Sequence, residues 1–139
     1  MSIVVDTNVL SELLRASPDP RVMAWVAAQP VDTLFVSAVT QAEMMLGASL
    51  LPAGKRRATL EDALRGIFAQ DFAGRILPFD ADAVPAYVDV MARRRSAGRP
   101  ISQFDAQIAA IALRRGDSLA TRNVDDFRDC GVALINPWD

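Results

Sequence analysis

The sequence predicts an α/β fold in which a parallel β-sheet is covered by helices on both faces. The prediction rests on the short apolar runs in the chain and on the longer segments that separate them. Short apolar runs, rich in β-branched residues, alternate along the chain with longer segments in which apolar residues recur at helical spacing. Strands that alternate with helices are typical of parallel sheets. The first run, residues 3–5, is followed at once by the carboxylate of Asp6.

Five strands are predicted from apolar runs bounded by charged or turn-forming residues. Ile3-Val4-Val5 is entirely apolar, as expected for a strand buried on both faces. The other runs are of similar length and are separated by segments long enough to hold a crossover helix. The predicted strands are residues 3–5, 33–37, 75–79, 118–121 and 132–135.

Six helices are predicted between these strands. Asp19-Pro20 places a capping residue before a first-turn proline, and Gly116 can adopt the left-handed conformation that ends a helix. Pro85 is compatible with a helix only within its first turn. The predicted helices are residues 7–15, 20–29, 40–51, 55–72, 82–97 and 102–115, with a single helical turn at 125–129.

Length and composition favour one cytoplasmic domain spanning residues 1–139. No apolar stretch approaches the ~20 residues that span a bilayer, and the start lacks the pattern of a secretory leader. The absence of histidine excludes a Ser-His-Asp triad and a histidine-ligated zinc site. A single cysteine, Cys130, excludes a CxxC pair. Chemistry must therefore come from carboxylates, hydroxyls, amides or arginine.

The distribution of basic residues gives an indication of possible binding partners. The net charge is −2, yet every basic residue except Lys55 is an arginine, and arginines cluster at 56–57 and 93–95. Guanidinium groups match phosphate geometry, so phosphate-bearing partners are one interpretation. Solvated helix ends are the simpler explanation of each cluster taken alone.

Three acids are predicted to meet at one edge of the sheet. Asp6 directly follows the first strand, and Glu43 lies early in the helix after the second. Asp105 begins the helix that leads into the fourth strand, so the amino end of that helix lies at the same edge. In open α/β sheets ligands bind outside the carboxyl ends of the strands.

Each acid also has a structural explanation. Asp6 can cap the following helix, and both Thr40-x-x-Glu43 and Ser102-x-x-Asp105 match the capping box. Asp105 nonetheless falls on the predicted apolar stripe of its helix, and a helix dipole offsets a half-buried charge by only ~0.3–1 kcal/mol. That stripe is Ile101, Phe104, Ile108, Ile111 and Ala112.

The turn after the fourth strand adds candidates at the same edge. Asp126 would cover the site if this turn folds back, and Asp125 would then point away. Asn123 could instead cap the short helical turn. Two carboxylates 4 Å apart repel by about 4 kcal/mol at an effective dielectric near 20. A hard divalent cation would relieve that repulsion, and oxygen ligands alone favour Mg²⁺ or Mn²⁺.

Taken together, these motifs resemble the PIN domain, and within it the VapC-like toxins. The resemblance covers the whole chain, and its specificity lies in the order and spacing of the motifs. The motifs are Asp6-Thr7-Asn8, Thr40-x-x-Glu43, Phe104-Asp105 and Thr121-Arg122-Asn123-x-x-Asp126-Phe127. Residues 74–80 and the ending Asn136-Pro137-Trp138 are similar to the FitB-like branch.

The resemblance implies a PIN-like three-layer sandwich with a central parallel five-stranded sheet. It also implies an endoribonuclease dependent on Mg²⁺, for which Mn²⁺ can substitute, that hydrolyses RNA phosphodiester bonds with metal-activated water. The chain would be the toxin of a type II toxin–antitoxin system. Its implied partners are RNA, a VapB-like antitoxin, operator DNA reached only through that antitoxin, and a second copy of the chain in a homodimer.

The same motif matches imply the roles of the site residues. Asp6 and Asp105 would be the core metal ligands, Glu43 a third, and Asp126 a further catalytic acid. Some FitB-like members carry an acid at the position of Asn123, so Asn123, Asp126 or water would complete the site. The residues expected to hold the carboxylates in place are Asn8, Thr121 and Asn123.

Other functions fit the sequence less well. A PIN-like module without catalysis, working only through a partner protein and nucleic acid, is the main alternative, and three matching acids argue against it. A receiver-like signalling domain would need a lysine on a late loop, whereas Lys55 is the only lysine. A phosphatase with an Asp-x-Asp pair fails at Asn8, which cannot act as the second acid.

Overall fold

The structure, a computed structural model, describes all residues from 1 to 139 and contains one five-stranded parallel sheet. The strand order is β3-β2-β1-β4-β5, with β1 in the middle. This confirms the predicted α/β class and the five-stranded parallel sheet. The strands are β1 (Ile3–Val5), β2 (Leu34–Ser37), β3 (Ile76–Leu77), β4 (Ser118–Ala120) and β5 (Leu134–Ile135).

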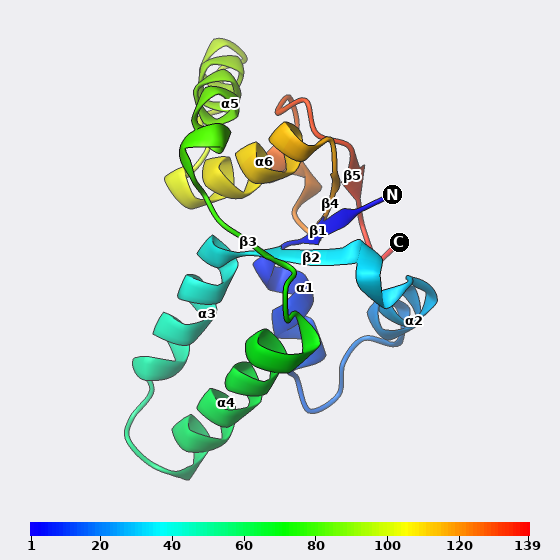
Figure 1. The fold of residues 1–139 in the computed structure, drawn as a ribbon, viewed down its shortest axis with the longest axis vertical. Helices are drawn as coiled ribbons and strands as arrows, with labels where there is room; N and C mark the ends of the chain where they lie inside the picture. The colour runs from blue at the N-terminus through cyan, green and yellow to red at the C-terminus, as the bar shows by residue number, and fades with distance from the viewer.

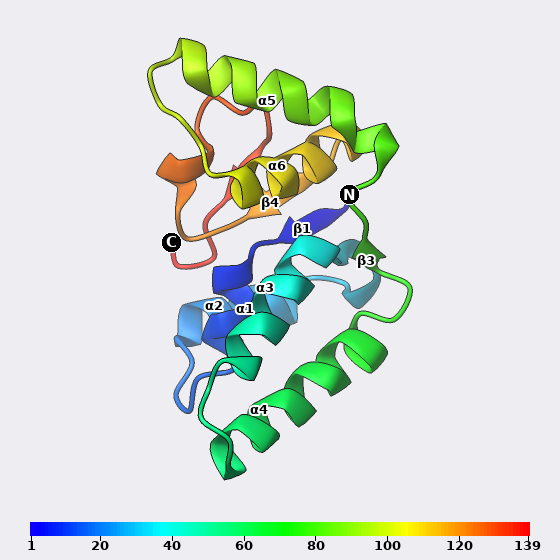
Figure 2. The ribbon, with the colours of Figure 1, turned by 90° about the vertical axis from the view of Figure 1, so that its left-hand side faces the viewer.

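Helices cover both faces of the sheet in three layers (Figures 1 and 2). Two helices, α5 and α6, lie on one side of the sheet, and the remaining four lie on the other. The helices are α1 (Thr7–Leu13), α2 (Pro20–Ala28), α3 (Ala38–Ser49), α4 (Lys55–Gly66), α5 (Val84–Ser96) and α6 (Gln103–Arg115). None of them is long and apolar enough to cross a bilayer.

The alternation of side chains along β1 divides the core into two halves. Ile3 and Val5 pack with the layer of α1 to α4, whereas Val4 packs with α5 and α6. All three residues are buried. A strand buried on both faces needs apolar residues at successive positions, which explains the uninterrupted run in the sequence.

Two strands are shorter than predicted, and both lie at the edges of the sheet. The predicted strand 75–79 is reduced to β3, and 132–135 to β5. Each edge strand pairs with a single neighbour, β2 or β4, so its ladder stops where that partner ends.

Several element ends also differ from the prediction. The helix predicted at 7–15 ends at Leu13, and α4 stops at Gly66 and continues as a wider π-helical turn, Ile67–Asp71. A 3₁₀ turn, Ala81–Ala83, precedes α5, and Asp80 makes no side-chain capping bond to it. The turn after β4 spans Val124–Phe127 rather than 125–129.

The predicted capping box at Thr40 is wrong. Helix α3 begins at Ala38, and its cap is Ser37, whose Oγ accepts a hydrogen bond from the backbone N–H of Thr40 at 2.9 Å. Because β2 runs directly into α3, the first hydroxyl in reach of the free N–H groups is that of Ser37. Glu43 is therefore not needed as a capping residue.

The apolar stripe predicted for α6 is correct except at Phe104. Ile108, Ile111 and Ala112 are buried, but Phe104 is 55% exposed. Burial along this helix begins at Ala106, because the first turn extends beyond the core. The predicted ends of α6 are confirmed: Ser102 is its N-cap, and Gly116 adopts φ of 73° at its C-cap.

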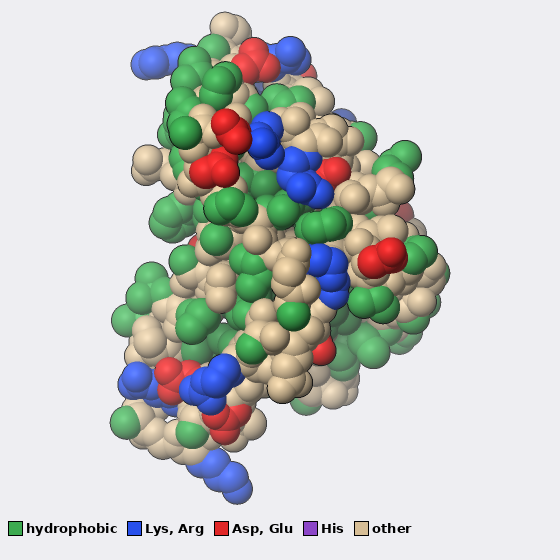
Figure 3. Space-filling view, in the orientation of Figure 1, with side chains coloured by type: hydrophobic (Ala, Val, Ile, Leu, Met, Phe, Trp, Pro, Cys, Tyr) green, Lys and Arg blue, Asp and Glu red, His purple; other side chains and the backbone are tan.

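The arginine clusters mainly serve the fold. Arg57 pairs with Glu61, and Arg93 pairs with Asp89. Arg94 is buried and donates hydrogen bonds to backbone carbonyl oxygens of the 124–128 segment. Figure 3 shows basic and acidic side chains interspersed on the face in view, without a continuous basic surface. Arg57 and Arg93 thus fit solvated helix faces, whereas Arg94 is a buried structural donor, which neither interpretation predicted.

Candidate active site

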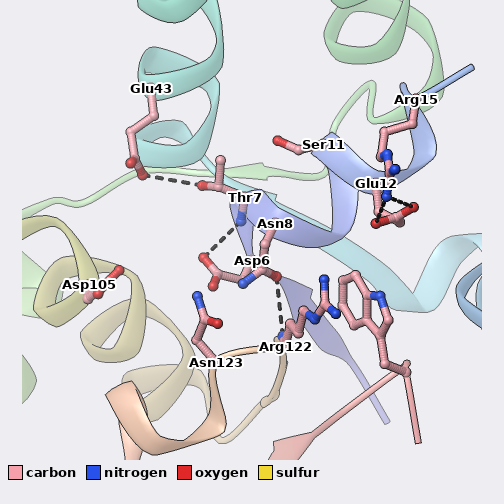
Figure 4. A pocket seen from close by; sticks show the side chains of 11 residues that line it. Asp6, Thr7, Asn8, Ser11, Glu12, Arg15, Glu43, Asp105, Arg122 and Asn123 are labelled. Carbon is pink, nitrogen blue, oxygen red and sulfur yellow. Dashed lines mark hydrogen bonds and ion pairs between the residues drawn. The ribbon is translucent and has the colours of Figure 1, made fainter. Parts of the chain in front are cut away.

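Asp6, Glu43 and Asp105 line one pocket at the carboxyl edge of the sheet. The pocket has a volume of about 520 Å³, and ten of its eleven lining residues are polar or charged. Figure 4 shows these acids approaching the same space from three elements: the end of β1, α3 and α6. The pocket lies beside the junction of β1 with β4, where the strand order reverses, as is typical of ligand sites in open α/β sheets.

Asp6 is the most buried of the three acids, with 5% of its surface exposed. It is the N-cap of α1, and its Oδ1 accepts a hydrogen bond from the backbone N–H of Thr7 at 2.8 Å. Its Oδ2 accepts one from the hydroxyl of Thr121 at 2.8 Å. Burial raises the pKa of Asp6 to about 6, against the lowering effect of these two bonds; the charges of Asp105 and Glu43 add to the rise.

Thr121 is held so that its proton points to Asp6. Its Oγ1 accepts hydrogen bonds from the side-chain amide of Asn8 at 3.2 Å and from the backbone N–H of Asn123 at 3.1 Å. The oxygen therefore uses its lone pairs on these donors and its proton on the carboxylate. Asn8, Thr121 and Asn123 thus form one network around Asp6, with Asn8 and Asn123 also on the pocket wall.

Glu43 comes from the second turn of α3 and is tied to α1. The hydroxyl of Thr7 donates to Glu43 Oε1 at 3.2 Å and lies 3.0 Å from the hydroxyl of Thr40. Burial raises the pKa of Glu43, the hydrogen bond from Thr7 lowers it, and the charge of Asp105 raises it further. The residue that the sequence associated with capping instead turns its carboxylate into the pocket.

Asp105 lies in the first turn of α6 and is half-buried. Its backbone N–H donates to Ser102 Oγ at 3.2 Å, as the predicted capping box requires. Burial raises the pKa of Asp105; the hydrogen bond with Ser102 and the charge of Arg94 lower it, and the charge of Asp126 raises it. Its negative charge in turn raises the pKa values of both Asp6 and Glu43.

The turn after β4 contributes Asn123 but not Asp126 to the pocket wall. Asp126 is exposed, and it is close enough to Asp105 to raise its pKa. Asn123 makes no side-chain capping bond to the turn, so its amide is free to face the pocket. Asp125 is also absent from the pocket wall and pairs with Arg128.

Sequence reasoning missed the opposite wall of the pocket. Ser11, Glu12 and Arg15 of α1 line it, together with Arg122 and Trp138. Glu12 and Arg15 form an ion pair at 3.2 Å, and their i, i+3 spacing is the one sequence signal that could have drawn attention to this wall. Nothing in the sequence pattern indicated that Trp138, near the chain end, packs beside the turn after β4.

The donor set suits a hard divalent ion. All side chains that could bind a metal here offer oxygen, and the pKa values of the three acids are raised mainly by burial and further by the charge of a neighbouring acid. No three carboxylates converge closely enough to bind one ion together. Mg²⁺ needs fewer, since it binds through one or two carboxylates and keeps several waters.

Comparison with known proteins adds independent information. A sequence model described as "PIN domain" matches residues 3–132. The chain is 46% identical to VapC ribonuclease Y4jK of Sinorhizobium fredii, with 99% of this chain and 98% of that protein aligned. It is 39% identical to Toxin FitB of Neisseria gonorrhoeae, covering 98% of each. A solved structure of FitAB bound to the IR36 DNA fragment superimposes with a TM-score of 0.93 at 39% identity, covering 99% of this chain and 96% of that one.

Proposed function

Because the chain belongs to the PIN-domain family, and within it to the VapC and FitB toxins of toxin–antitoxin systems, we propose that it is an endoribonuclease dependent on Mg²⁺ or Mn²⁺. The observation that carries this proposal is the shared pocket of Asp6, Glu43 and Asp105, in which the charge of Asp105 raises the pKa values of both other acids and the charge of Glu43 raises that of Asp6. A divalent cation would favour the ionised form of all three.

In this proposal Asp6 and Asp105 are the main ligands of the ion, and Glu43 is a third, reached through water. When bound, the ion would activate a water molecule and stabilise the charge that develops on the phosphodiester. Thr121 and the backbone N–H of Thr7 hold Asp6 in one orientation with both oxygens hydrogen-bonded. The hydroxyl of Thr7 donates a hydrogen bond to one carboxylate oxygen of Glu43 and so orients that side chain. Asn123 is the candidate to complete the site from the turn, because Asp126 lies off the pocket wall.

The proposed partners follow from the relatives. The structural neighbour at 39% identity is a FitAB complex on a DNA fragment, so we expect a VapB-like antitoxin to bind this chain and to provide the contact with operator DNA. A homodimer remains a proposal, as does action on RNA in the cytoplasm.

Cleavage of RNA tests the function directly. Incubating total structured RNA with the wild-type chain in Mg²⁺ or Mn²⁺ should give defined fragments, and EDTA should abolish them. Asp105→Asn should reduce the rate by at least about 100-fold, since it removes a charged ligand. Asp62→Asn is the matched control, because Asp62 is an exposed acid on α4 that pairs only with Arg65.

Two outcomes would contradict the proposal. Cleavage that survives in Asp105→Asn and Asp6→Asn would remove these acids from the reaction. A wild-type chain that binds its antitoxin but cuts no RNA with either ion would favour the alternative, a PIN-like module without catalysis.

A further inference from the structure

One cation on the pocket wall forms no ion pair within the protein, although its charge reaches Asp19 and helps to lower the pKa of that carboxyl. Arg15 and Arg122 are the two basic residues on its wall. Arg15 pairs with the buried carboxylate of Glu12. Arg122 takes part in no ion pair, and its guanidinium donates no hydrogen bond to the protein; its only such bond is made by the backbone N–H. Its five N–H donors are therefore available to a ligand.

Arg122 is nevertheless held in place. Its guanidinium carbon lies 5.1 Å from the ring centroid of Trp138, which is only 5% exposed. Such a cation–π contact is worth about 0.5–1 kcal/mol at an exposed site. It orients the guanidinium without using its hydrogen-bond donors.

The same residue is linked to the acids through Asn8. The backbone N–H of Arg122 donates to Asn8 Oδ1 at 3.3 Å, and Asn8 Nδ2 donates to the Thr121 hydroxyl, which donates to Asp6. Figure 4 shows Arg122 and Asn8 on the side of Asp6 opposite Glu43. The pocket thus has an acidic end and a cationic end with a fixed connection between them.

We propose that Arg122 anchors a phosphate of the RNA strand that neighbours the phosphodiester being cut. This inference rests on the proposed nuclease function and specifies how the substrate lies in the pocket. A metal ion held by the acids and a guanidinium are both cations, so a ligand that touches both must be repeatedly anionic along its length, as an RNA backbone is. The planar fork of arginine matches a phosphate with two parallel hydrogen bonds.

An acidic peptide is less suited to this position. Before it reached Arg122 it would have to approach three carboxylates that already repel one another. A bound metal ion would attract either ligand, but only an RNA backbone carries a phosphate at every residue, so that one phosphate can reach the ion while its neighbour pairs with the arginine fork. The observations therefore favour nucleic acid over a protein side chain as the partner of Arg122.

The experiment combines a substitution with neutralisation of single phosphates. Cleavage in Mn²⁺ is measured as kcat/KM on RNA oligonucleotides that contain the cut site, each with one phosphate replaced by an uncharged methylphosphonate. For the wild-type chain, one position beside the cut bond should lower kcat/KM by about 10- to 100-fold, the range of a charged hydrogen bond. On unmodified RNA, Arg122→Ala should have a kcat/KM lower than that of the wild-type chain by a similar factor. With the methylphosphonate at that one position, the kcat/KM of Arg122→Ala should fall no further.

Control variants separate anchoring from general effects. Arg122→Lys keeps the charge without the fork and should lie between the wild-type chain and Arg122→Ala. Arg65→Ala removes the same charge from an exposed arginine on α4 and should behave as the wild-type chain does. The rise in Tm caused by Mn²⁺ should be the same in Arg122→Ala as in the wild-type chain, which shows that the fold and the acids are intact.

Several results would overturn the anchor. Arg122→Ala could retain full activity, or it could respond to every methylphosphonate as the wild-type chain does. It could also leave RNA cleavage unchanged while weakening the antitoxin complex, which would assign Arg122 to the protein partner.

A second assay keeps the anchor testable if the wild-type chain cuts no RNA. Binding of the same oligonucleotides is then measured by fluorescence anisotropy in Ca²⁺ over a range of salt concentrations. Loss of one phosphate contact should reduce the slope of log K against log salt by about 0.7 in Arg122→Ala. An equal slope for variant and wild-type chain would refute the anchor independently of catalysis.

Discussion

Replacing Asp6 by asparagine should stabilise the metal-free protein at neutral pH, although it removes a residue from the candidate active site. Asp6 is 5% exposed, and its pKa is about 6 in the folded protein against an ordinary value of 3.8. The folded state thus holds this proton more tightly than the unfolded state. Stability from this group is complete below about pH 4, decreases as the pH rises, and is lost above about pH 6.

The magnitude follows from the two pKa values. The difference between about 6 and 3.8 is worth about 3 kcal/mol, because each tenfold change in proton affinity is worth about 1.4 kcal/mol. Asparagine avoids this penalty, but it offers one oxygen to the two donors, Thr7 and Thr121, that now bind separate oxygens of Asp6. Losing one hydrogen bond costs about 1 kcal/mol, which leaves a net gain of about 1–2 kcal/mol at pH 7.5.

Calorimetry in EDTA measures the effect. Asp6→Asn should raise Tm by about 4–8 °C at pH 7.5 and should lower it slightly at pH 4, where Asp6 is already protonated. Saturating Mn²⁺ should raise the Tm of the wild-type chain much more than that of Asp6→Asn. The exposed acid Asp62 provides the control, since Asp62→Asn should change neither the pH dependence nor the response to Mn²⁺.

The reasoning fails if Asp6→Asn lowers Tm equally at pH 7.5 and pH 4. That result would mean that the hydrogen bonds of Asp6 outweigh its desolvation, and that no uncompensated charge awaits a cation.

Three further predictions concern the surroundings of the acids. Nuclease activity of the wild-type chain should fall as the pH decreases through about 6, because a protonated Asp6 is a poor metal ligand; a pH–rate profile that stays flat between 5 and 8 would be inconsistent with this. Thr121→Val removes the hydroxyl that donates to Asp6, so activity in Mn²⁺ should drop about 10- to 100-fold with the secondary structure retained by circular dichroism. Arg94→Met leaves the carbonyl oxygens of the 124–128 segment without their buried donor; urea denaturation should show a loss of about 2–3 kcal/mol, and an unchanged midpoint would show that water replaces the guanidinium.

The sequence was most informative where local chemistry and global position agree. The apolar run of β1 fits only a strand covered on both faces, and the Ser102 cap and Gly116 define α6 through backbone hydrogen bonding alone. Asp6 and Asp105 were placed at one edge by a rule of parallel sheets that does not depend on strand order. Local signals of this kind are set by residues within one or two turns of each other.

Predictions from local sequence patterns failed where the role of a residue depends on the position of a neighbouring element. Thr40-x-x-Glu43 matches a capping box, but Ser37 takes the capping role because β2 continues into α3 without a loop. Phe104 has the spacing of a core residue, yet it is exposed because burial along α6 begins only at Ala106. Neither outcome depends on the residue itself; both depend on where the neighbouring element stops.

By itself, the sequence determined the class of fold, a first strand buried on both faces and the set of acids that can approach one another, because periodicity and capping are properties of a single segment. Only the tertiary structure decided that β1 lies between β2 and β4, that Thr7 and Thr121 bind the acids from both sides, and that Arg122 lies on the wall of the same pocket, stacked on Trp138. These facts join residues more than thirty positions apart, and their geometry arises from the packing of helices on the sheet rather than from any local pattern.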